Sequence, residues 1–554
     1  MSTTISPVAR IFSLVKLERK EITAIYFFAI LSGLIQLSLP LGVQAIIGFV
    51  MGGAMSTSLI ILISLVILGV LFTGLMQISQ MRLNEKVQQK IFVRYSFAFA
   101  ERLPKLDLKK TDSFYLPELV NRFFDITILQ KGLSKLLFEI PAATIQVLFG
   151  LILLTFYHPA FILFGLILGL ILWLILYYTG SRGLQTSLLE SSSKYSIAAW
   201  LEEMARTIKS LKFSSGAKYH LQKTDKKVSR YLDFRTSHFK ILLQQFYTLV
   251  GFKVVITAAM MIVGSILLVN QQLTIGQFIA AEIVIILVIS SVEKMIGNFD
   301  NVYDVLTAVE KLSNFIDKPV EENGTLPFTP GGNGVALQME NVSFGYTPGK
   351  KVLNNISLKI NAGEKVAVSG LDGKGKSTLL KLLTGSYPDF DGAILLNNVP
   401  VSNYDLSSLR LQTGIMLSQQ DIFAGSLLDN ITMGNPAVSL QRVNELAEKT
   451  GLLSYISTLS RGYDTELDAA GIRLPRNVIH KILLVRALAH KPSLLLLEEP
   501  WQGLEEKNKT QVQETLLHES KNTTLLVVTN DKQFLQQCDK VIYMNEKGIT
   551  VKEN

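Results

Sequence analysis

The chain alternates between long stretches without any charged residue and stretches rich in lysine and arginine. No Asp, Glu, Lys or Arg occurs in the 60 residues 22–81 or in the 42 residues 140–181. A helix in the core of a water-soluble protein rarely runs so far without a charge, because one of its faces meets water. The pattern therefore predicts membrane-spanning helices and disfavours the alternative, a soluble helical bundle.

Each uncharged stretch is long enough for two crossings, since one crossing needs about 20 apolar residues. The first stretch is expected to turn near Gly52 and the second near His158 and Pro159. A third hairpin is expected to turn at "NQQLTIG", residues 270–276. The six predicted spans cover approximately residues 22–50, 57–79, 138–157, 160–180, 245–269 and 276–298.

The connections between the hairpins are basic, whereas the three hairpin turns carry no charge. Residues 80–135 contain 11 Lys or Arg against 6 acids, and residues 180–244 contain 12 against 5. Basic loops stay on the cytoplasmic side, so both termini are predicted in the cytoplasm and the protein in the lipid of the cell (inner) membrane. This topology accounts for the net charge of +9, and no nucleic-acid partner is needed to explain it.

The second half of the chain has a different pattern. The Pro-, Gly- and Asn-rich segment "KPVEENGTLPFTPGGNG" precedes short strands that alternate with helices. We therefore expect a multi-domain protein with an all-α membrane domain and an α/β domain. Its predicted parts are a cytoplasmic elbow segment at 1–20, six spans within 21–302, a linker at 303–335 and the α/β domain at 336–554.

A glycine-rich loop in the α/β domain has the spacing of a phosphate-binding loop. The segment "EKVAVSGLDGKGKSTLLKLL" reads as strand, loop and helix, and it fills the pattern G-x-x-x-x-G-K-[ST]. Glycines let backbone N–H groups surround phosphate oxygens, a lysine adds positive charge, and a Ser hydroxyl can bind Mg²⁺. The predicted ATP-binding residues are Gly370, Gly373, Lys374, Gly375, Lys376, Ser377 and Thr378, with Ser377 also a metal ligand.

Two adjacent acids follow a run of four leucines in "LLLLEEPWQGLEE", residues 494–506. Such a run is typical of a buried parallel strand, whose carboxyl end lies where α/β sheets bind ligands. We expect Glu498 to be a Mg²⁺ ligand and Glu499 to take a proton from an attacking water. The alternative for Glu499 is an exposed residue at the start of a helix.

Six spans followed by these elements resemble a half-transporter of the ATP-binding cassette (ABC) exporter family along essentially the whole chain. "FGYTPGKKVLNNISLKI" is similar to the family's adenine-stacking segment, with Tyr346 as its aromatic residue; a packed surface tyrosine is the alternative. Further resemblances lie in "IFAGSLLDNI", "GYDTEL" and "RALAHKPSLLLLEEP". The resemblance implies a homodimer or heterodimer that uses ATP and Mg²⁺ to drive transport of an unidentified substrate.

Several motifs depart from the family pattern. The signature LSGGQ, which completes the partner's ATP site, reads "LPRNV" at residues 474–478, and Asn530 replaces the switch histidine. Glu498 replaces an aspartate, and counting back from Phe423 puts Ser418 at the glutamine loop. A shift of one or two residues would bring in Gln419 or Gln420, and we take Gln419 as the candidate metal ligand.

These departures predict slow hydrolysis of ATP. Loss of one transition-state donor commonly lowers a rate by a factor of about 10² to 10³. We expect Arg476 to replace part of the missing signature contact with ATP, and Asn530 to act at the catalytic site. The alternative function is a nucleotide-sensing membrane subunit, impaired in catalysis, that regulates or assembles with an active partner.

Within the spans, Glu282 is an unusual residue, because a carboxylate in the membrane is costly and generally faces a cavity or the bundle interior. It is predicted about 10 Å below the outer turn, whereas Lys253 lies some 27 Å deep, so the two are not expected to pair. A cavity-lining role, a buried hydrogen bond and a lipid-edge position remain open for Glu282. The segments "KKTDSFYLPELVNRF" and "EEMARTIKSL" resemble the family's coupling helices, with ordinary surface helices as the alternative.

Overall fold

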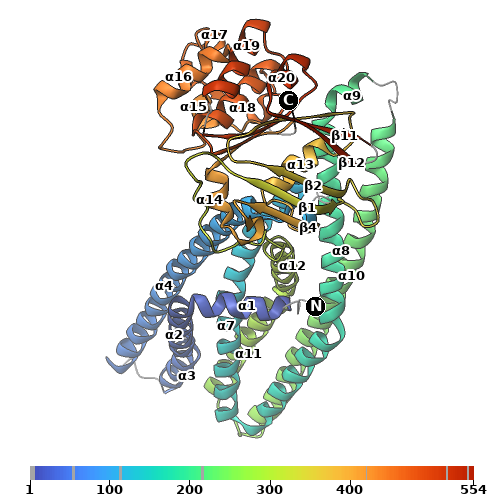
Figure 1. Ribbon diagram of the computed structural model, residues 1–554. Coiled ribbons are helices and arrows are strands. Elements are labelled where there is room, and N and C mark those ends of the chain that lie inside the picture. The colour runs from blue at the N-terminus through green and yellow to red at the C-terminus, as the bar shows by residue number, and fades with distance from the viewer. Residues whose placement is uncertain are drawn as a thin grey trace. The chain divides into compact units, whose positions relative to one another are not determined.

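The computed structural model describes residues 6–52, 57–111, 115–213, 218–418, 421–519, 522–545 and 548–553. The chain divides into two compact units (Figure 1). The helical unit comprises Met1–Pro104 and Phe114–Lys318, and the α/β unit comprises Lys105–Ser113 and Pro319–Asn554.

Within its described residues the helical unit contains six stretches that are long and apolar enough to cross a membrane, which agrees with the predicted number of spans. Helices α4, α8 and α10 have 46, 45 and 51 residues. At about 1.5 Å per residue they are longer than a hydrocarbon core of about 30 Å. The helices of this unit are α1 (Pro7–Leu17), α2 (Arg19–Gln36), α3 (Ser38–Met51), α4 (Thr57–Arg102), α6 (Leu116–Asn121), α7 (Asp125–Tyr157), α8 (Ile162–Arg206), α9 (Ile208–Phe213), α10 (Tyr219–Val269), α11 (Ile275–Gly297) and α12 (Phe299–Ile316).

The first span is two helices, where the sequence predicted one. Helix α2 ends at Gln36, and α3 begins at Ser38. Pro40 has no N–H to donate to the carbonyl of Gln36, and its ring is incompatible with a regular helix across that position. The break at Leu37 is therefore a consequence of Pro40.

The last helix of this unit reaches further along the chain than expected. Helix α12 ends at Ile316, although residues from 303 onward were predicted to be linker. Val305, Leu312 and Phe315 are fully buried, each with 0% relative exposure. The Phe315 ring stacks on the Phe99 ring, with centroids 4.0 Å apart. Apolar burial on one side of the helix thus extends its ordered region.

Helix α7 lies at the centre of the helical unit and packs against α2, α4, α11 and α12, while α8 runs beside α10 (Figure 1). A buried polar network joins three helices: the Gln245 Nε2 donates to Thr179 Oγ1 at 2.7 Å and to the Tyr303 hydroxyl at 2.9 Å. Paired in this way, these polar groups avoid the cost of burial without a partner.

The two charged residues considered in the spans do not pair with each other, as predicted. Lys253 Nζ instead lies 2.5 Å from Glu293 Oε2. Glu282 is half-buried. Its carboxylate forms no hydrogen bond or ion pair with any residue that the structure describes. The hypothesis of a structural hydrogen bond at Glu282 therefore finds no partner in this part of the chain.

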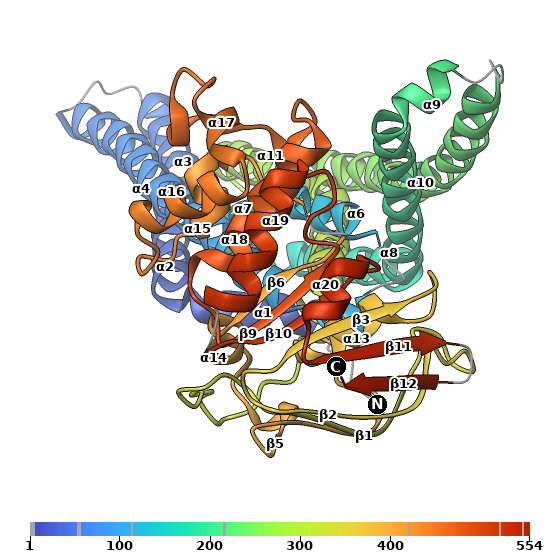
Figure 2. The same cartoon turned by 45° about the horizontal axis from the view of Figure 1, so that its top comes forward.

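The α/β unit contains a six-stranded sheet in the order β12-β11-β3-β10-β9-β6 and a four-stranded antiparallel sheet in the order β2-β1-β4-β5 (Figure 2). Its strands are β1 (Leu337–Phe344), β2 (Leu353–Ile360), β3 (Lys365–Gly370), β4 (Asp391–Leu396), β5 (Val399–Pro400), β6 (Thr413–Met416), β7 (Gly425–Ser426), β8 (Glu466–Leu467), β9 (Leu494–Glu498), β10 (Thr524–Val528), β11 (Lys540–Asn545) and β12 (Gly548–Glu553). Its helices are α5 (Leu108–Thr111), α13 (Lys376–Leu383), α14 (Leu406–Leu411), α15 (Leu427–Thr432), α16 (Leu440–Lys449), α17 (Leu452–Ile456), α18 (Arg476–Ala489), α19 (Glu506–Glu514) and α20 (Lys532–Gln537).

Strand β9 is the leucine run, and it is a buried parallel strand, as its sequence predicted. It pairs in parallel with β10 on one side and with β6 on the other. Leu494 through Leu497 are each at most 1% exposed. Because β3, β10 and β9 are parallel, the residues that follow them meet at one edge of the sheet.

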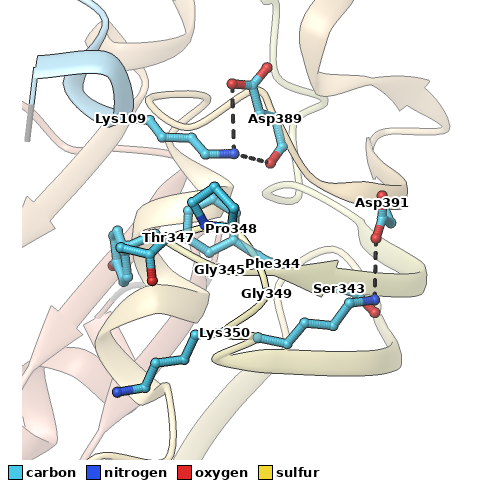
Figure 3. A pocket seen from close by; sticks show the side chains of 12 residues that line it. Lys109, Ser343, Phe344, Gly345, Thr347, Pro348, Gly349, Lys350, Asp389 and Asp391 are labelled. Carbon is cyan, nitrogen blue, oxygen red and sulfur yellow. Dashed lines mark hydrogen bonds and ion pairs between the residues drawn. The ribbon is translucent and has the colours of Figure 1, made fainter.

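A short segment from the loop between the second and third spans belongs to the α/β unit. Leu106 forms a β-bridge with Val320. Figure 3 shows Lys109, just inside α5, pointing at Asp389; its Nζ donates to the Asp389 carbonyl at 2.9 Å and lies 5.2 Å from the centroid of the Phe344 ring. The predicted coupling segment that begins at Lys109 is thus anchored to the α/β unit at its start, while its residues 112–114 lie outside the described residues.

Candidate functional site

The glycine-rich loop connects β3 to α13 and is built on glycines that other residues could not replace. The φ angles of Gly370, Gly373 and Gly375 are 145°, 77° and 90°. A Cβ atom on Gly370 would lie 2.3 Å from the Met544 carbonyl oxygen, and one on Gly375 would lie 2.7 Å from Leu353 Cδ2. Loops with such conformations form backbone concavities that bind anions, and at Gly370 and Gly375 the space would not admit a side chain.

Lys376 begins α13 and carries its charge back over this loop. The residue is 9% exposed, and Nζ donates to the carbonyls of Gly370 at 2.7 Å and Leu371 at 3.0 Å. It also lies 3.3 Å from Asp372 Oδ1. The predicted residues Gly373 and Lys374 form the turn between these groups and α13. A positive charge is therefore held at the mouth of the loop.

Ser377 and Glu498 form an oxygen-rich pair beside the loop, as the acidic run after β9 suggested. The Ser377 hydroxyl donates to Glu498 Oε1, and the Ser418 backbone N–H donates to Glu498 Oε2 at 2.8 Å. Oxygen donors of this kind suit Mg²⁺, which usually takes one or two protein ligands together with phosphate oxygens and water. The donor set fits that ion. Gln419 and Gln420 lie outside the described residues.

Glu499 lies directly after β9 in a backbone conformation that is uncommon outside glycine, with φ of 44°. Two hydrogen bonds hold it there: its N–H donates to the Val528 carbonyl at 2.8 Å, and its carbonyl accepts from His480 Nε2 at 2.9 Å. The residue is half-buried, and α19 begins only at Glu506. The alternative of an exposed residue at a helix start is therefore wrong.

The surroundings of Glu499 shift the pKa of its carboxyl group. Burial raises its pKa, and a hydrogen bond from Thr529 Oγ1, 3.4 Å from Oε2, opposes that rise. Trp501 Nε1 donates to the same Thr529 hydroxyl at 3.2 Å. Neither Thr529 nor His480 was identified from the sequence, because both reach Glu499 from elements that only the fold brings together.

Asn530 follows β10 and meets the start of the glycine-rich loop. Its Oδ1 accepts hydrogen bonds from Ser369 Oγ at 2.8 Å and from the Gly370 N–H at 3.3 Å. The carbonyl end of the amide is therefore used within the protein, which leaves Nδ2 as the group available to a ligand.

Tyr346 lies beside the first turn of α13. Its hydroxyl is 3.1 Å from Thr378 Oγ1, and its ring meets those of Phe344 and Tyr387 edge to face. The turn that follows it, residues 347–350, borders a cavity of about 240 Å³ (Figure 3). Tyr346 is thus next to the loop, and the hydroxyl of Thr378, which was predicted to bind nucleotide, is directed at Tyr346.

Arg476 is the first residue of α18, and Pro475 caps that helix without being part of it. The guanidinium is exposed and makes no hydrogen bond with any residue that the structure describes. It lines a cavity of about 390 Å³ together with His480, Glu498 and Glu499 of its own chain. The structure therefore brings Arg476 near Glu498 and Glu499. His480 could have been suggested from the sequence by its position four residues after Arg476, which puts both side chains on one face of a helix.

The chain matches two family models, described as "ABC transporter transmembrane region" over residues 22–292 and "ABC transporter" over residues 353–502. Alpha-hemolysin translocation ATP-binding protein HlyB of Escherichia coli O157:H7 is 28% identical over 355 residues, which cover 64% of this chain and 50% of that protein. A putative export ATP-binding/permease protein of Rickettsia felis is 25% identical over 66% of this chain and 64% of that protein. The matched region thus spans half to two thirds of these relatives.

A solved structure described as a bacterial Atm1-family ABC exporter with ATP bound has the same fold. The two superpose with a TM-score of 0.83, over 96% of this chain and 94% of that one, at 18% sequence identity. At this identity the likeness concerns the fold, which is a six-helix membrane domain joined to an α/β nucleotide-binding domain.

Proposed function

This chain belongs to the ABC transporter family, with a membrane domain and a nucleotide-binding domain on one polypeptide, and we propose that it is an ATP-driven exporter subunit. Two such chains, or this chain and a second half-transporter, form the working dimer. The α/β unit lies in the cytoplasm and the helical unit crosses the inner membrane. The names of two relatives, a translocation ATP-binding protein and a putative export ATP-binding/permease protein, support this direction of transport.

The observation that carries the proposal is the meeting of a phosphate-binding loop with two acids in a chain that has six spans. Glu498 contacts Ser377 of the loop, and Glu499 lies within the same cavity as Glu498. An acidic residue with a purely structural role, in an ion pair or a helix cap, does not need a half-buried position and a left-handed backbone conformation, which Glu499 has. Such strain is typical of functional sites.

Each residue has a proposed role in ATP hydrolysis. Lys376 and the N–H groups of the loop bind phosphate oxygens, Tyr346 packs on the adenine, and Ser377 with Glu498 and Gln419 holds Mg²⁺. A bound Mg²⁺ supplies charge neutralisation at the phosphates. Glu499 accepts the proton of the attacking water. Closure of two nucleotide domains on ATP then drives the helical units between inward-open and outward-open states.

We expect hydrolysis to be slow because two donors to the transition state are altered. Asn530 offers an uncharged amide, of which only the Nδ2 end is not already engaged by Ser369 and Gly370. The segment "LPRNV" has neither the serine nor the glycines of the family signature. Arg476 is proposed to bind the γ-phosphate of ATP held by the partner chain, since its guanidinium has no competing bond among the described residues.

Replacing Arg476 with Ala is expected to lower steady-state turnover of ATP about tenfold, which is the loss of one charge-assisted hydrogen bond of about 1.5 kcal/mol. The matched control is Arg473→Ala, which removes an exposed arginine three residues earlier and should leave turnover unchanged. Phosphate release by the purified chain in lipid nanodiscs measures both. Equal turnover in wild type and Arg476→Ala would remove Arg476 from the mechanism.

Replacing Thr529 with Val is expected to move the acid limb of the turnover profile to higher pH. The Thr529 hydroxyl lowers the pKa of Glu499, so its loss raises that pKa further. A general base works only when deprotonated, and the rate then begins to fall at a higher pH as acid is added. Thr529→Ser keeps the hydroxyl and should keep the wild-type profile. An unshifted limb in Thr529→Val would show that Glu499 is not the titrating base.

A second candidate function is a nucleotide-sensing subunit that regulates an active partner, and the altered residues Arg476 and Asn530 favour it. The two functions differ in one measurement, which is magnesium-dependent phosphate release by the purified chain in lipid. Release that is lost in Lys376→Ala and Glu499→Gln supports the exporter. Tight ATP binding without any release supports the sensor.

A further inference from the structure

Helix α18 reaches the proposed general base through one side chain, that of His480. Its Nε2 donates a hydrogen bond to the Glu499 carbonyl at 2.9 Å. The same carbonyl accepts from the Gln502 N–H at 3.0 Å, and the Glu499 N–H donates to the Val528 carbonyl. Among the described parts of the chain, His480 therefore supplies the one side-chain contact to the backbone of Glu499.

The charge state of the His480 ring does not decide this contact. Burial lowers the pKa of His480, and the carbonyls of Glu499 and Pro500, which accept hydrogen bonds from the ring, oppose that change. Because a carbonyl oxygen only accepts, Nε2 carries a hydrogen in both the neutral and the charged ring. The hydrogen bond is thus a fixed feature of the site.

The helix that carries His480 is firmly attached to its neighbours. Lys481 Nζ donates to the Gly451 carbonyl at 3.1 Å, and Arg486 Nε donates to the Asn430 carbonyl at 2.6 Å. Ile482, Leu484 and Val485 are fully buried, each with 0% relative exposure. A displacement of α18 would therefore carry His480 with it, because the helix is held along its length.

Helix α18 also begins with the altered signature segment "LPRNV", residues 474–478. Arg476 at its start and His480 one turn later lie on one helix face, and both line the cavity that contains Glu498 and Glu499. Any contact that moves the start of α18 is therefore passed to the carbonyl of Glu499 over a single helical turn.

The conformation of Glu499 makes it sensitive to such a contact. Its φ of 44° is unfavourable for a residue other than glycine and persists only where the surroundings impose it. Two of its contacts, to the Val528 carbonyl and the Thr529 hydroxyl, come from β10 and the residue after it. The contact from His480 comes from a separate helix, so the orientation of Glu499 depends on where α18 lies against the sheet.

We propose that His480 is a positioning residue, which holds the backbone of Glu499 and makes the orientation of this base depend on the position of α18. The altered signature segment thereby governs the base of its own chain. This inference rests on the proposed hydrolysis of ATP and adds to it a control of the catalytic carboxylate.

Steady-state phosphate release by the full chain in lipid nanodiscs with Mg-ATP tests the proposal. His480→Leu should lower kcat about tenfold, since small misplacements of a reacting group are costly, and should change KM for ATP by less than about twofold. The matched control is His518→Leu, the same change at an exposed position, which should behave as wild type. Equal kcat in His480→Leu and wild type would overturn the proposal.

Two further substitutions separate the hydrogen bond from the bulk of the ring. His480→Gln places an amide N–H the same number of bonds from the backbone as Nε2 and should restore most of kcat. His480→Asn places it one bond nearer the backbone and should be as slow as His480→Leu. If His480→Gln is as slow as His480→Leu, the ring acts by packing alone and the proposal is wrong.

A double variant shows whether His480 acts through Glu499. In Glu499→Gln the carboxylate is already lost, so adding His480→Leu should leave the residual single-turnover rate unchanged. A further decrease of about tenfold would place the action of His480 elsewhere and contradict the proposal.

A measurement without hydrolysis uses Trp501, whose Nε1 donates to the Thr529 hydroxyl beside the Glu499 carboxylate. The chain has three tryptophans, so Trp173→Phe with Trp200→Phe leaves Trp501 as the sole emitter. ATP added without magnesium should change the Trp501 emission in this chain.

The same change should appear with His480→Gln added and be absent with His480→Leu added. A change that persists in His480→Leu, or that is absent from all three chains, would overturn the proposal.

The failure of this inference and that of the export function give different results. A Trp501 response that requires the donor at His480, without any phosphate release, contradicts ATP-driven export and leaves the positioning role intact. Phosphate release with the same kcat in wild type and His480→Leu contradicts the positioning role alone.

Discussion

Replacement of Glu499 by Gln is expected to lower the turnover of ATP by a factor of about 10² or more, because a general base commonly contributes 10²- to 10⁴-fold. The substitution keeps the shape of the side chain and removes the atom that accepts a proton. The backbone bonds of Glu499 to Val528 and His480 do not involve the carboxyl group, so the fold at the end of β9 should persist. ATP affinity should stay close to that of wild type.

Single-turnover and steady-state phosphate release in nanodiscs measure the effect, and equilibrium binding of a fluorescent ATP analogue measures affinity. The matched control is Glu506→Gln, the same chemical change at an exposed position in the first turn of α19. Its turnover should equal that of wild type. If Glu499→Gln hydrolyses ATP as fast as this control, the base lies elsewhere and the proposed site is wrong in its central role.

The parts of the fold that the sequence predicted are those with strong one-dimensional signals. Sixty positions without a charge admit few structures other than two membrane crossings, and four consecutive leucines between parallel neighbours admit few other than a buried strand. The break at Leu37 was also signalled, by Pro40, but the apolar run concealed it. The predicted boundary near residue 303 is wrong for α12, because the proline-rich segment that suggests a linker begins only after Leu312 and Phe315, which continue the buried side of the helix.

The residues of the proposed site also divide into those that the sequence predicted and those that only the fold reveals. The loop from Gly370 to Ser377 is defined by spacing, and its contact with Glu498 follows from the parallel order of β3, β10 and β9. The left-handed conformation of Glu499 has no local signal in the sequence. The spacing of Arg476 and His480 puts both on one helix face, but it does not predict the hydrogen bond from His480 to Glu499, which depends on α18 meeting the end of β9.

The groups around the glycine-rich loop are already bonded to one another, as Ser377 is to Glu498 and Asn530 to Ser369. Groups that satisfy each other's hydrogen bonds can be in place before a ligand arrives.

Lys376→Ala is expected to weaken ATP binding on the order of 100-fold, from the loss of charge-assisted contacts of about 1.5–3 kcal/mol each. The lysine is 9% exposed and is held over the loop by the carbonyls of Gly370 and Leu371, so its charge is pre-positioned for phosphate. Lys376→Arg should not rescue binding, because a planar guanidinium cannot donate from the same point in this space. Turnover should fall with affinity, in contrast to Glu499→Gln, which retains affinity.

Binding of the fluorescent ATP analogue to the full chain in nanodiscs measures the loss, and Lys507→Ala, at an exposed position of α19, is the matched control. Removal of Lys376 also leaves two loop carbonyls without a donor, so the melting temperature must be compared with that of wild type. A variant that melts like wild type and no longer binds ATP places the charge of Lys376 on the phosphates. If that variant binds ATP as the control does, the loop at Gly370–Ser377 is not the nucleotide site, and the energy for transport must enter the protein at another place.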